Sequence, residues 1–398
     1  MSHSRSPRRY AFLVRPHMGG TYTVFSVLRG ALARHGVELR WLAATSDREA
    51  ARARMEDGEG ELAPASSDSG ADVGRALVQH LESHYDGVFV NVLTSAAEMN
   101  VARYLGPRVT RIMVVHNITP GTYAAARALR DHVQATIGVS PRIVDDLVRR
   151  HRFPVQSTVC VPNAVPVSSY AKGRGEKAGG PLRVLFLGRI EESAKGVLWL
   201  PEIMRQVRDA PITLTVAGDG VDRARLEEAC RDLDGTIAFV GAVPPGEVPR
   251  LLATHDVLLM PSRFEGLPMV ALEAMAAGCV PVLSRIRGVT DFMVRPGVDG
   301  ELFGVGRTRE AAEILRNLQT HGKELARLSD NARETARRML DCEAMGSAYA
   351  KVVADAEARG LARPPLSISR WSYPRGFGPG IRSLAPEWCK HLVRRWVA

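Results

Sequence analysis

The sequence is poor in cysteine and in long apolar runs, and both shortages exclude classes of protein. Its 398 residues include five cysteines, widely scattered and without a C-x-x-C pair. This pattern argues against a disulfide framework or a zinc site and favours reduced thiols in a cytosolic protein. No stretch reaches the roughly 18 continuous apolar residues that a membrane-spanning helix needs. The apolar run 11–14 is shorter than the core of a signal peptide and is typical of a first strand.

Charge is the next feature, because 53 Lys and Arg residues outnumber 43 Asp and Glu residues and give a formal net charge of +10. Such an excess favours anionic partners: phosphorylated small molecules, acidic membrane surfaces or nucleic acid. An arginine-rich composition that merely leaves a basic surface explains the number equally well. No helix-turn-helix, zinc-finger or RNA-binding motif stands out, so we expect no nucleic acid partner.

Short β-type runs alternate with helical segments along most of the chain, which is long enough for two or three domains with full cores. The runs are 10–15, 37–44, 87–93, 111–116, 135–140, 183–188, 212–218, 236–241, 256–261 and 279–284. This alternation predicts parallel sheets covered on both faces. We therefore expect an α/β fold of two Rossmann-like, doubly wound domains that face one another across a cleft, with ligands at the carboxyl ends of the strands.

Domain boundaries follow from composition. Residues 168–180 are rich in Gly, Lys and Ser and have no apolar period, which is typical of a linker. We expect an N-terminal domain over 1–167, a C-terminal domain over 181–345 and a final segment over 346–398. Residues 52–73 are polar and rich in Gly, Ser and Asp, which predicts a mobile insertion.

Two features follow strands of the first half. Gly19 and Gly20 open a helix after the first strand, where glycine lets the backbone approach a ligand and the helix N-terminus offers free N–H groups. A tight turn would explain the same pair. His116 ends the run 111–116 and would point into the cleft, although a lone histidine is more often structural than catalytic.

In the second half, Arg189 and Lys195 lie in the loop after the run 183–188 and flank the start of the next helix. Two cations beside a helix N-terminus suit a diphosphate. A solvated basic loop is the alternative. Asp291 lies in the glycine loop 285–293, which should face the same edge of the sheet, but an isolated G-x-x-D pattern carries little information.

The stretch RFEGLPMVALEAMAAGCVPVL, residues 263–283, places two carboxylates around an apolar helix. Pro268 suits the first helical turn. Glu265 would then precede the helix, and Glu273 would lie inside it and lean toward its N-terminus. A buried carboxylate is costly unless it is paired. Glu273 can accept hydrogen bonds from both hydroxyls of a ribose; backbone groups or a buried arginine are the alternative partners.

Taken in order, these motifs resemble a known family. The run 265–292 resembles the E-x7-E region of retaining glycosyltransferases of family four, the glycosyl transferases of group 1, which have the GT-B fold. GRIEESAKG at 188–196 is similar to that family's donor-phosphate loop, and VPNAV at 161–165 is similar to its interdomain segment. HMGG and VVH lie where the family has its glycine-rich loop and active-site histidine. The resemblance covers roughly residues 10–340.

The resemblance implies roles at the matching positions. Arg189 and Lys195 would bind the donor diphosphate, Glu273 would hold the ribose hydroxyls, and Glu265 would contact the transferred sugar. His116 would lie beside the sugar and the acceptor. Near the diphosphate or along the helix N-terminus, the remaining donor-binding positions would be Gly19, Gly20, Gly266, Leu267, Pro268, Met269 and Val270.

The sequence departs from the family pattern in three places. Ala164 stands where a glycine usually follows the asparagine, EGLP replaces the common ESFG form, and the usual GGxxE loop has become RGVTD. Asp291 shortens the acidic arm of that loop and leaves its role open.

The resemblance also implies a reaction: transfer of a hexosyl group, with retention, from a UDP- or GDP-linked sugar to a glycan, a lipid-linked molecule or another glycoconjugate. It implies no cofactor and no metal. A sugar-nucleotide epimerase or hydrolase of related fold and a non-catalytic GT-B scaffold are the alternatives.

The last residues, 363–398, interleave arginine, tryptophan and proline, and 387–397 could form a short amphipathic helix. We expect this tail to pack back on the first domain. The alternative is a peripheral contact with an anionic membrane at its cytoplasmic face.

Overall fold

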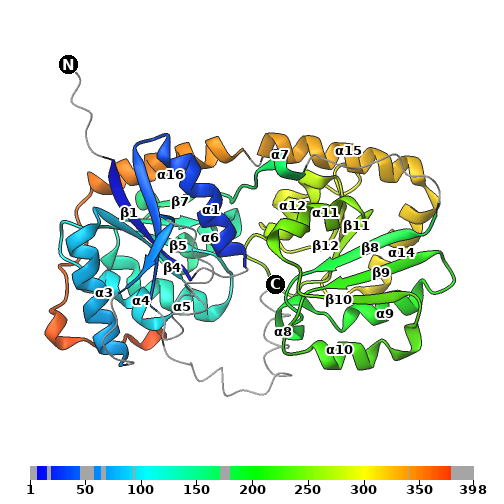
Figure 1. Ribbon diagram of the computed structural model, residues 1–398, viewed down its shortest axis with the longest axis horizontal. Helices are drawn as coiled ribbons and strands as arrows, with labels where there is room; N and C mark the ends of the chain where they lie inside the picture. The colour runs from blue at the N-terminus through cyan, green and yellow to red at the C-terminus, as the bar shows by residue number, and fades with distance from the viewer. Residues whose placement is uncertain are drawn as a thin grey trace. The chain divides into compact units, whose positions relative to one another are not determined.

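The computed structural model describes residues 7–15, 19–44, 58–63, 69–92, 95–170, 180–339 and 341–377. The chain forms two compact units: unit 1 comprises Met1–Asn163 and Cys342–Ala398, and unit 2 comprises Ala164–Asp341. Each unit is built on one parallel sheet with helices on both faces (Figure 1), as the alternating sequence pattern predicts.

Unit 1 holds a seven-stranded sheet in the order β3-β2-β1-β4-β5-β6-β7. The central strands are buried on both faces, which is why they appear in the sequence as continuous apolar runs. The strands are β1 Arg8–Leu13, β2 Val37–Ala43, β3 Gly60–Leu62, β4 Gly87–Val92, β5 Thr110–Val115, β6 Ala135–Gly138 and β7 Thr158–Cys160.

The helices of unit 1 lie on both faces of this sheet. In Figure 1, α1 and α16 lie on one face and α3 and α4 on the other. Gly346 of α16 packs so closely on α1 that an added Cβ would lie 2.5 Å from the Cβ of Ala31. The main helices are α1 Gly20–Ala33, α3 Gly70–His84, α4 Ala96–Asn100, α5 Pro120–Leu129, α6 Pro141–Asp145 and α16 Cys342–Glu357.

Unit 2 holds a six-stranded sheet in the order β10-β9-β8-β11-β12-β13. Its strands are β8 Leu182–Leu187, β9 Ile212–Ala217, β10 Ile237–Gly241, β11 Val257–Met260, β12 Val280–Ser284 and β13 Glu301–Phe303. Its helices are α7 Val167–Tyr170, α8 Glu192–Lys195, α9 Trp199–Gln206, α10 Arg223–Ala229, α11 Val248–Ala253, α12 Met269–Ala277, α13 Thr290–Met293, α14 Thr308–Thr320 and α15 Gly322–Met339. A cluster of buried hydrophobic side chains fills the space between β8, β9 and the helices α9 and α14.

The same aspartate contact recurs at the amino ends of both sheets. In unit 1, Asp86 Oδ2 accepts the backbone N–H of Arg9 at 2.8 Å, and the Asp86 N–H donates to the Arg9 carbonyl. In unit 2, Asp256 makes the same two contacts with Arg183, at 2.9 and 2.8 Å. Asp256 is fully buried and also pairs with the Arg183 guanidinium at 3.2 Å, whereas Asp86 is exposed.

Residues 52–73 do not form the predicted insertion where they are described. Residues 60–62 are β3, which pairs with Trp41–Ala43 of β2, and α3 begins at Gly70. Gly60 is required there because an added Cβ would lie 2.2 Å from the Trp41 ring. Composition misled the prediction because a short edge strand can be polar and glycine-rich. Residues 52–57 and 64–68 lie outside the described part.

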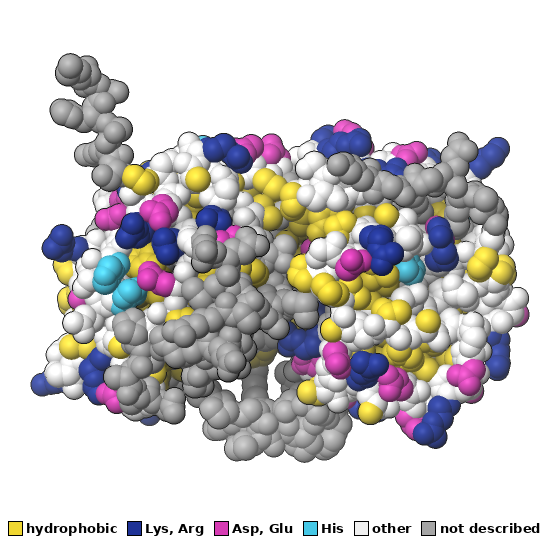
Figure 2. Space-filling view, viewed as in Figure 1, with side chains coloured by type: hydrophobic (Ala, Val, Ile, Leu, Met, Phe, Trp, Pro, Cys, Tyr) yellow, Lys and Arg dark blue, Asp and Glu magenta, His cyan; other side chains and the backbone are white. Residues whose placement is uncertain are grey.

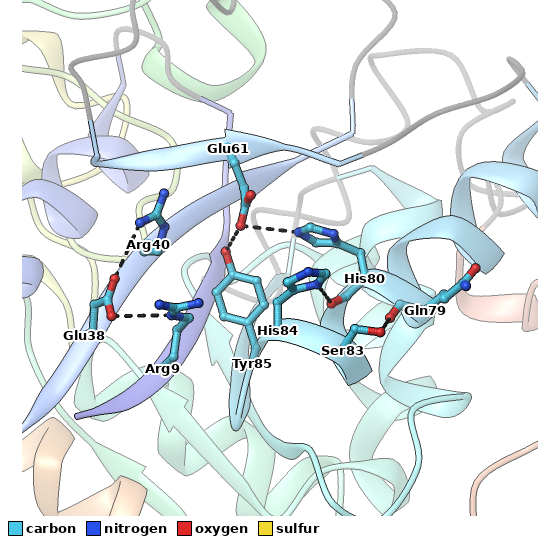
Figure 3. Close-up of polar contacts among 9 residues, drawn as sticks. All are labelled: Arg9, Glu38, Arg40, Glu61, Gln79, His80, Ser83, His84 and Tyr85. Atoms are coloured by element: carbon cyan, nitrogen blue, oxygen red, sulfur yellow. Dashed lines mark hydrogen bonds and ion pairs between the residues drawn. The ribbon is translucent and has the colours of Figure 1, made fainter. Parts of the chain in front are cut away.

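Glu61 of β3 joins this edge strand to α3 (Figure 3). Its carboxylate accepts the hydroxyl proton of Tyr85 and lies 3.3 Å from Nε2 of His80. Burial alone would raise the pKa of Glu61, but the contacts with Tyr85 and His80 outweigh it and hold the pKa below its usual range. The cluster therefore fixes an edge strand that has few apolar side chains.

The C-terminal segment lies on unit 1 as far as Phe377. Trp371 stacks on Tyr104 with ring centroids 4.5 Å apart, and the Ser372 carbonyl accepts a hydrogen bond from Arg103 at 2.8 Å. Gly74 of α3 makes room for the indole, since an added Cβ would lie 2.1 Å from it. The predicted amphipathic helix over 387–397 lies outside the described residues.

Charged side chains are interspersed by sign over both units on the face shown in Figure 2. Many of them form ion pairs three or four residues apart on one helix, such as Arg309 with Glu313. Among the described helices, none has the length and apolar character to cross a bilayer.

Candidate active site

The candidate site residues of unit 2 lie after the carboxyl ends of two neighbouring strands, β8 and β11. Lys195 ends the short helix α8, and its Nζ donates to Oε1 of Glu265 at 2.6 Å. The same oxygen accepts the hydroxyl proton of Ser262 at 2.7 Å. The structure thus brings together two residues that are 70 positions apart in the sequence and that we had predicted independently.

An arginine that the sequence analysis did not single out braces this arrangement. Arg263 donates through Nε to the Glu192 carbonyl at 3.0 Å and pairs with the Glu192 carboxylate. Its guanidinium also lies 3.8 Å from the centroid of the Trp199 ring, a cation–π contact. Gly196 takes a left-handed φ of 60°, and an added Cβ there would lie 2.4 Å from the Pro261 carbonyl. The two loops are therefore tightly fitted to each other.

Arg189 follows β8 and is far more accessible than Lys195. Its side chain is 74% exposed, and its Nη1 contacts Oε2 of Glu191 at 3.1 Å. A surface ion pair of this kind contributes little stability. The guanidinium is therefore free to exchange Glu191 for an anionic ligand, whereas Lys195 is held in place by Glu265.

The helix α12 begins at Met269, so Pro268 directly precedes the helix, one residue before the first turn in which we expected it. The N–H groups of Ala271 and Leu272 donate back to the Pro268 carbonyl. In the described part of the chain, the N–H groups of Met269 and Val270 have no backbone acceptor. Gly266, Leu267 and Pro268, which precede the helix, are buried. The partly exposed start of α12 thus offers two backbone donors.

Glu273 has a partner that the sequence analysis did not foresee. The hydroxyl of Tyr170 makes a hydrogen bond to the Glu273 carboxylate, and Tyr170 is buried against α12 as part of α7. Burial raises the pKa of Glu273 above its usual range, and the hydrogen bond from Tyr170 opposes that rise. Neither a backbone group nor an arginine is needed to explain how this carboxylate tolerates burial.

In the loop after β12, Asp291 makes a hydrogen bond within the loop itself. Oδ1 of Asp291 accepts the N–H of Gly288 at 2.6 Å, and Gly288 has a positive φ of 70°. The carboxylate therefore stabilises the turn in which it lies.

In unit 1, the candidate residues follow β1 and β5, which flank β4 in the sheet. Gly20 is the first residue of α1, and Gly19, in an extended conformation, precedes it. Both glycines are exposed, and the Gly19 carbonyl accepts the N–H groups of Tyr22 and Thr23 at 3.1 Å each. The start of α1 is therefore open to the solvent, as a ligand-binding glycine loop requires.

His116 directly follows β5 and is held by a neutral residue of β4. Nε2 of His116 lies 2.7 Å from Oδ1 of Asn91, whose Nδ2 donates to the Leu13 carbonyl at 3.0 Å. The amide oxygen is therefore the acceptor, so Nε2 carries the proton and Nδ1 keeps its lone pair. Burial lowers the pKa of His116 to about 4, so the imidazole is neutral at physiological pH. It can accept a proton or a hydrogen bond from a hydroxyl.

Several contributing residues were missed from the sequence, and the reasons differ. Tyr170 lies in the segment assigned to the linker, and Asn91 lies inside an apolar run. Ser262 and Arg263 adjoin the E-x7-E stretch and could have been found by asking what holds its first carboxylate. Among the described residues, no group of three His, Cys, Asp or Glu side chains is arranged to hold a metal ion.

Comparison with known sequences matches unit 2 to a family. Residues 181–321 match the profile of the family described as Glycosyl transferases group 1. The 2-deoxystreptamine glucosyltransferase of Streptomyces kanamyceticus is 37% identical over 35% of this chain and 36% of its own length. The glycogen synthase of Mycobacterium tuberculosis is 30% identical over 46% of this chain and 45% of its own length. Both matches span less than half of these relatives.

Comparison with solved structures extends over both units. The Anabaena protein HepE in complex with UDP-glucose has a TM-score of 0.72 at 17% identity and covers 87% of this chain and 99% of its own. Sucrose-phosphate synthase from Thermosynechococcus elongatus has a TM-score of 0.74 at 17% identity, with 88% and 99% covered. At this identity the likeness establishes the fold, so the chain as a whole has the GT-B fold of two Rossmann-like units. The match to the group 1 glycosyl transferases is limited to residues 181–321.

Proposed function

We propose that this protein transfers a sugar, with retention, from a nucleoside diphosphate sugar that binds to unit 2. The observation that carries the proposal is the Lys195–Glu265–Ser262 contact at the carboxyl ends of β8 and β11, within the segment that matches the family. Chemistry of this kind needs cations fixed where the leaving diphosphate develops its charge. Lys195 is such a cation, because Glu265 and the loop around it hold it in place.

Three kinds of hydrogen-bond donor would bind the diphosphate: an ammonium, a guanidinium and backbone N–H groups. An ammonium has three N–H donors, of which Lys195 gives one to Glu265, so two remain for phosphate oxygens. Arg189 would add a bidentate contact after leaving Glu191, and the free N–H groups at the start of α12 would add the favourable end of a helix dipole. Phosphate charge would thus be met without a metal ion, which stays a prediction.

Glu273 would bind the ribose hydroxyls, and it would do so beside or in place of its hydrogen bond with Tyr170. A carboxylate can accept several hydrogen bonds, so the ribose hydroxyls can join or replace the Tyr170 hydroxyl. On unit 1, neutral His116 would accept a hydrogen bond from a sugar or acceptor hydroxyl through Nδ1, while Gly19 and Gly20 would let the backbone approach the ligand.

The family match covers unit 2 alone, and the matched relatives bear names with different acceptors: 2-deoxystreptamine for one and glycogen for another. We infer from this that binding of the sugar donor to unit 2 should be tested before the acceptor is sought. UDP-glucose is the first donor to try, because the HepE structure contains it. The acceptor would be a glycan, a lipid-linked molecule or another glycoconjugate, used in the cytoplasm; a contact with anionic membrane stays a prediction.

The experiment measures binding of a panel of UDP- and GDP-sugars to the full chain by thermal shift and calorimetry. At least one donor should bind, and Glu273→Gln should weaken it about tenfold, since a charged acceptor loses roughly half its hydrogen-bond strength when neutral. Glu313→Gln, an exposed helical carboxylate paired with Arg309, is the matched control and should bind normally. Binding of no donor would favour a scaffold. Turnover of the donor at full rate without any acceptor would favour an epimerase or a hydrolase.

A further inference from the structure

Unit 1 contains a cavity of about 780 Å³ that the proposed reaction does not use. It opens at the amino ends of β1, β4, β5 and β6, under the segment that follows α16. Its charged lining consists of Arg8, Asp86, Arg108, Glu357, Arg359 and Arg363. Four guanidinium groups therefore face two carboxylates in one hollow.

The cavity is remote from the candidate active site of unit 1. Thr110, which begins β5, lines the cavity, and His116 follows the other end of the same strand. A strand rises about 3.3 Å per residue, so the six residues of β5 separate the two places by roughly 20 Å. A ligand in the cavity would not touch the reacting groups.

Two of the four arginines have no acidic partner among the described residues. Arg108 is exposed and makes no hydrogen bond or ion pair with any residue that the structure describes. Arg359 donates hydrogen bonds to two backbone carbonyls, those of Gln134 at 3.1 Å and Gln156 at 2.9 Å. Because both acceptors are uncharged, they do not neutralise the charge of the guanidinium. Arg363 lies 3.4 Å from Asp131, which is already paired with Arg130.

The carboxylates of the cavity are better satisfied than the arginines. Glu357 accepts from Arg8 at 2.9 Å and from the Tyr10 hydroxyl at 3.0 Å, and Asp86 accepts the backbone N–H of Arg9. The surplus in the cavity is therefore positive. Guanidinium forks match the oxygens of phosphate in pairs. Thr110 and Gln134, also in the lining, are uncharged hydrogen-bonding groups suited to hydroxyls.

We propose that this cavity binds a small phosphorylated molecule carrying hydroxyl groups, at a site separate from the donor site. Its volume lies within the range of about 300–1,000 Å³ that is usual for small-molecule sites and far exceeds what a bare phosphate fills. Arg108 comes from the loop before β5 and Arg359 and Arg363 from the segment after α16, so the ligand would cross-link that segment to the sheet. Bound ligand therefore raises the thermal stability of the chain.

The test uses ribose 5-phosphate as the probe and calorimetry on the full chain, with ribose as the phosphate-free control. The probe should bind, ribose should not, and Arg108→Ala should weaken binding about tenfold or more, the usual loss when a charge-assisted contact is removed. Arg149→Ala, an exposed arginine paired with Asp145, should bind like the wild type. Because the donor site also recognises phosphate and ribose, the same titration is made on Lys195→Ala, which should leave this binding unchanged.

Two results would overturn the proposal. One is equal binding of the probe by Arg108→Ala and Arg149→Ala. This comparison does not depend on a folding defect, because Arg108 is exposed and has no partner within the described part of the chain. The other is Arg108-dependent binding to vesicles of anionic lipid with no binding of ribose 5-phosphate, which would assign the surplus charge to a membrane headgroup. Arg359→Ala should act like Arg108→Ala where its melting temperature shows that it is folded.

Discussion

The two sheets share a strand order but place their candidate ligand-binding charges at opposite ends. In unit 2, the candidate groups at the carboxyl ends of the strands include Lys195, Arg189 and Glu265, and the amino end holds a closed Arg183–Asp256 pair. In unit 1, the candidate groups at the carboxyl ends are glycines and a neutral histidine, and surplus positive charge lines the amino end instead.

On the proposed function, this difference would adapt one architecture to two ligands. A charged donor needs fixed cations, whereas an acceptor that presents hydroxyls needs groups that exchange hydrogen bonds without net charge. The strand order positions both sets at equivalent edges, and the loops decide their chemistry.

The sharpest way to break the comparison is to remove the fixed cation. Lys195→Ala should lower kcat/KM about 100- to 1,000-fold, because preorganised stabilisation of the leaving diphosphate is lost. Steady-state kinetics with the donor found in the panel would measure it. Lys351→Ala removes an exposed lysine paired with Asp355 at 3.1 Å and should change the rate less than about twofold. Wild-type rates in Lys195→Ala would refute the charged character assigned to unit 2.

The aspartates at the amino ends allow a matched stability test. Asp256→Asn should lower the free energy of unfolding by about 2 kcal/mol, because the hydrogen bonds that Arg183 donates to this fully buried carboxylate are no longer charge-assisted. Asp86→Asn keeps an acceptor for the Arg9 N–H on an exposed side chain and should cost under about 1 kcal/mol. Urea unfolding of both variants measures the difference. Equal losses would show that the backbone contact, and not the burial, sets the cost.

A smaller effect is expected from Tyr170→Phe, which removes the hydrogen bond that opposes the raised pKa of Glu273. The carboxyl then protonates at still higher pH, so donor affinity should fall about fivefold, equivalent to one ordinary hydrogen bond. Calorimetry at several pH values would also show the loss of affinity beginning at higher pH than in the wild type. A pH profile identical to that of the wild type would show that Tyr170 has no influence on the carboxylate.

The smallest expected effect concerns His116, which should not titrate between pH 5.5 and 8. Because burial lowers the pKa of His116 to about 4, its NMR signals should not move between pH 5.5 and 8, and the imidazole should stay neutral. The unfolded chain binds a proton near the ordinary value of about 6.5. The contribution of His116 to stability is therefore complete above that pH and is lost as the pH falls toward 4. A midpoint near 6.5 in the folded protein, assigned with His116→Gln, would contradict the neutral character of this edge of unit 1.

The sequence predicted the fold well because the central strands of unit 1 are buried on both faces. The runs 87–93 and 111–116 match β4 and β5 within a residue, since largely apolar stretches have few alternatives between turn signals. The strand β3 was missed because an edge strand can be polar. The hydrophobic pattern of a sequence reflects which residues are buried, and β3 has only one fully buried residue, so its pattern is weak.

The candidate site was predicted in part, for a related reason. Motif spacing brings out residues that are close along the chain, such as Glu265 and Glu273. The Lys195–Glu265 pair spans 70 positions, and Tyr170 reaches Glu273 from a segment whose composition is typical of a linker. Contacts between distant segments depend on the packing of whole elements and have no local signature.

The return of the chain to unit 1 has a consequence for synthesis on the ribosome. Tyr349 of α16 is fully buried against the sheet of unit 1, with its ring 5.7 Å from that of Phe89. Unit 2 occupies the intervening residues, so the first unit to begin emerging is the last to be completed. Domains generally fold as they are made, N-terminal first. Here unit 1 cannot be completed until unit 2 has been translated, because α16 follows unit 2 in the sequence. Part of the apolar surface of the nascent unit 1 stays uncovered until then.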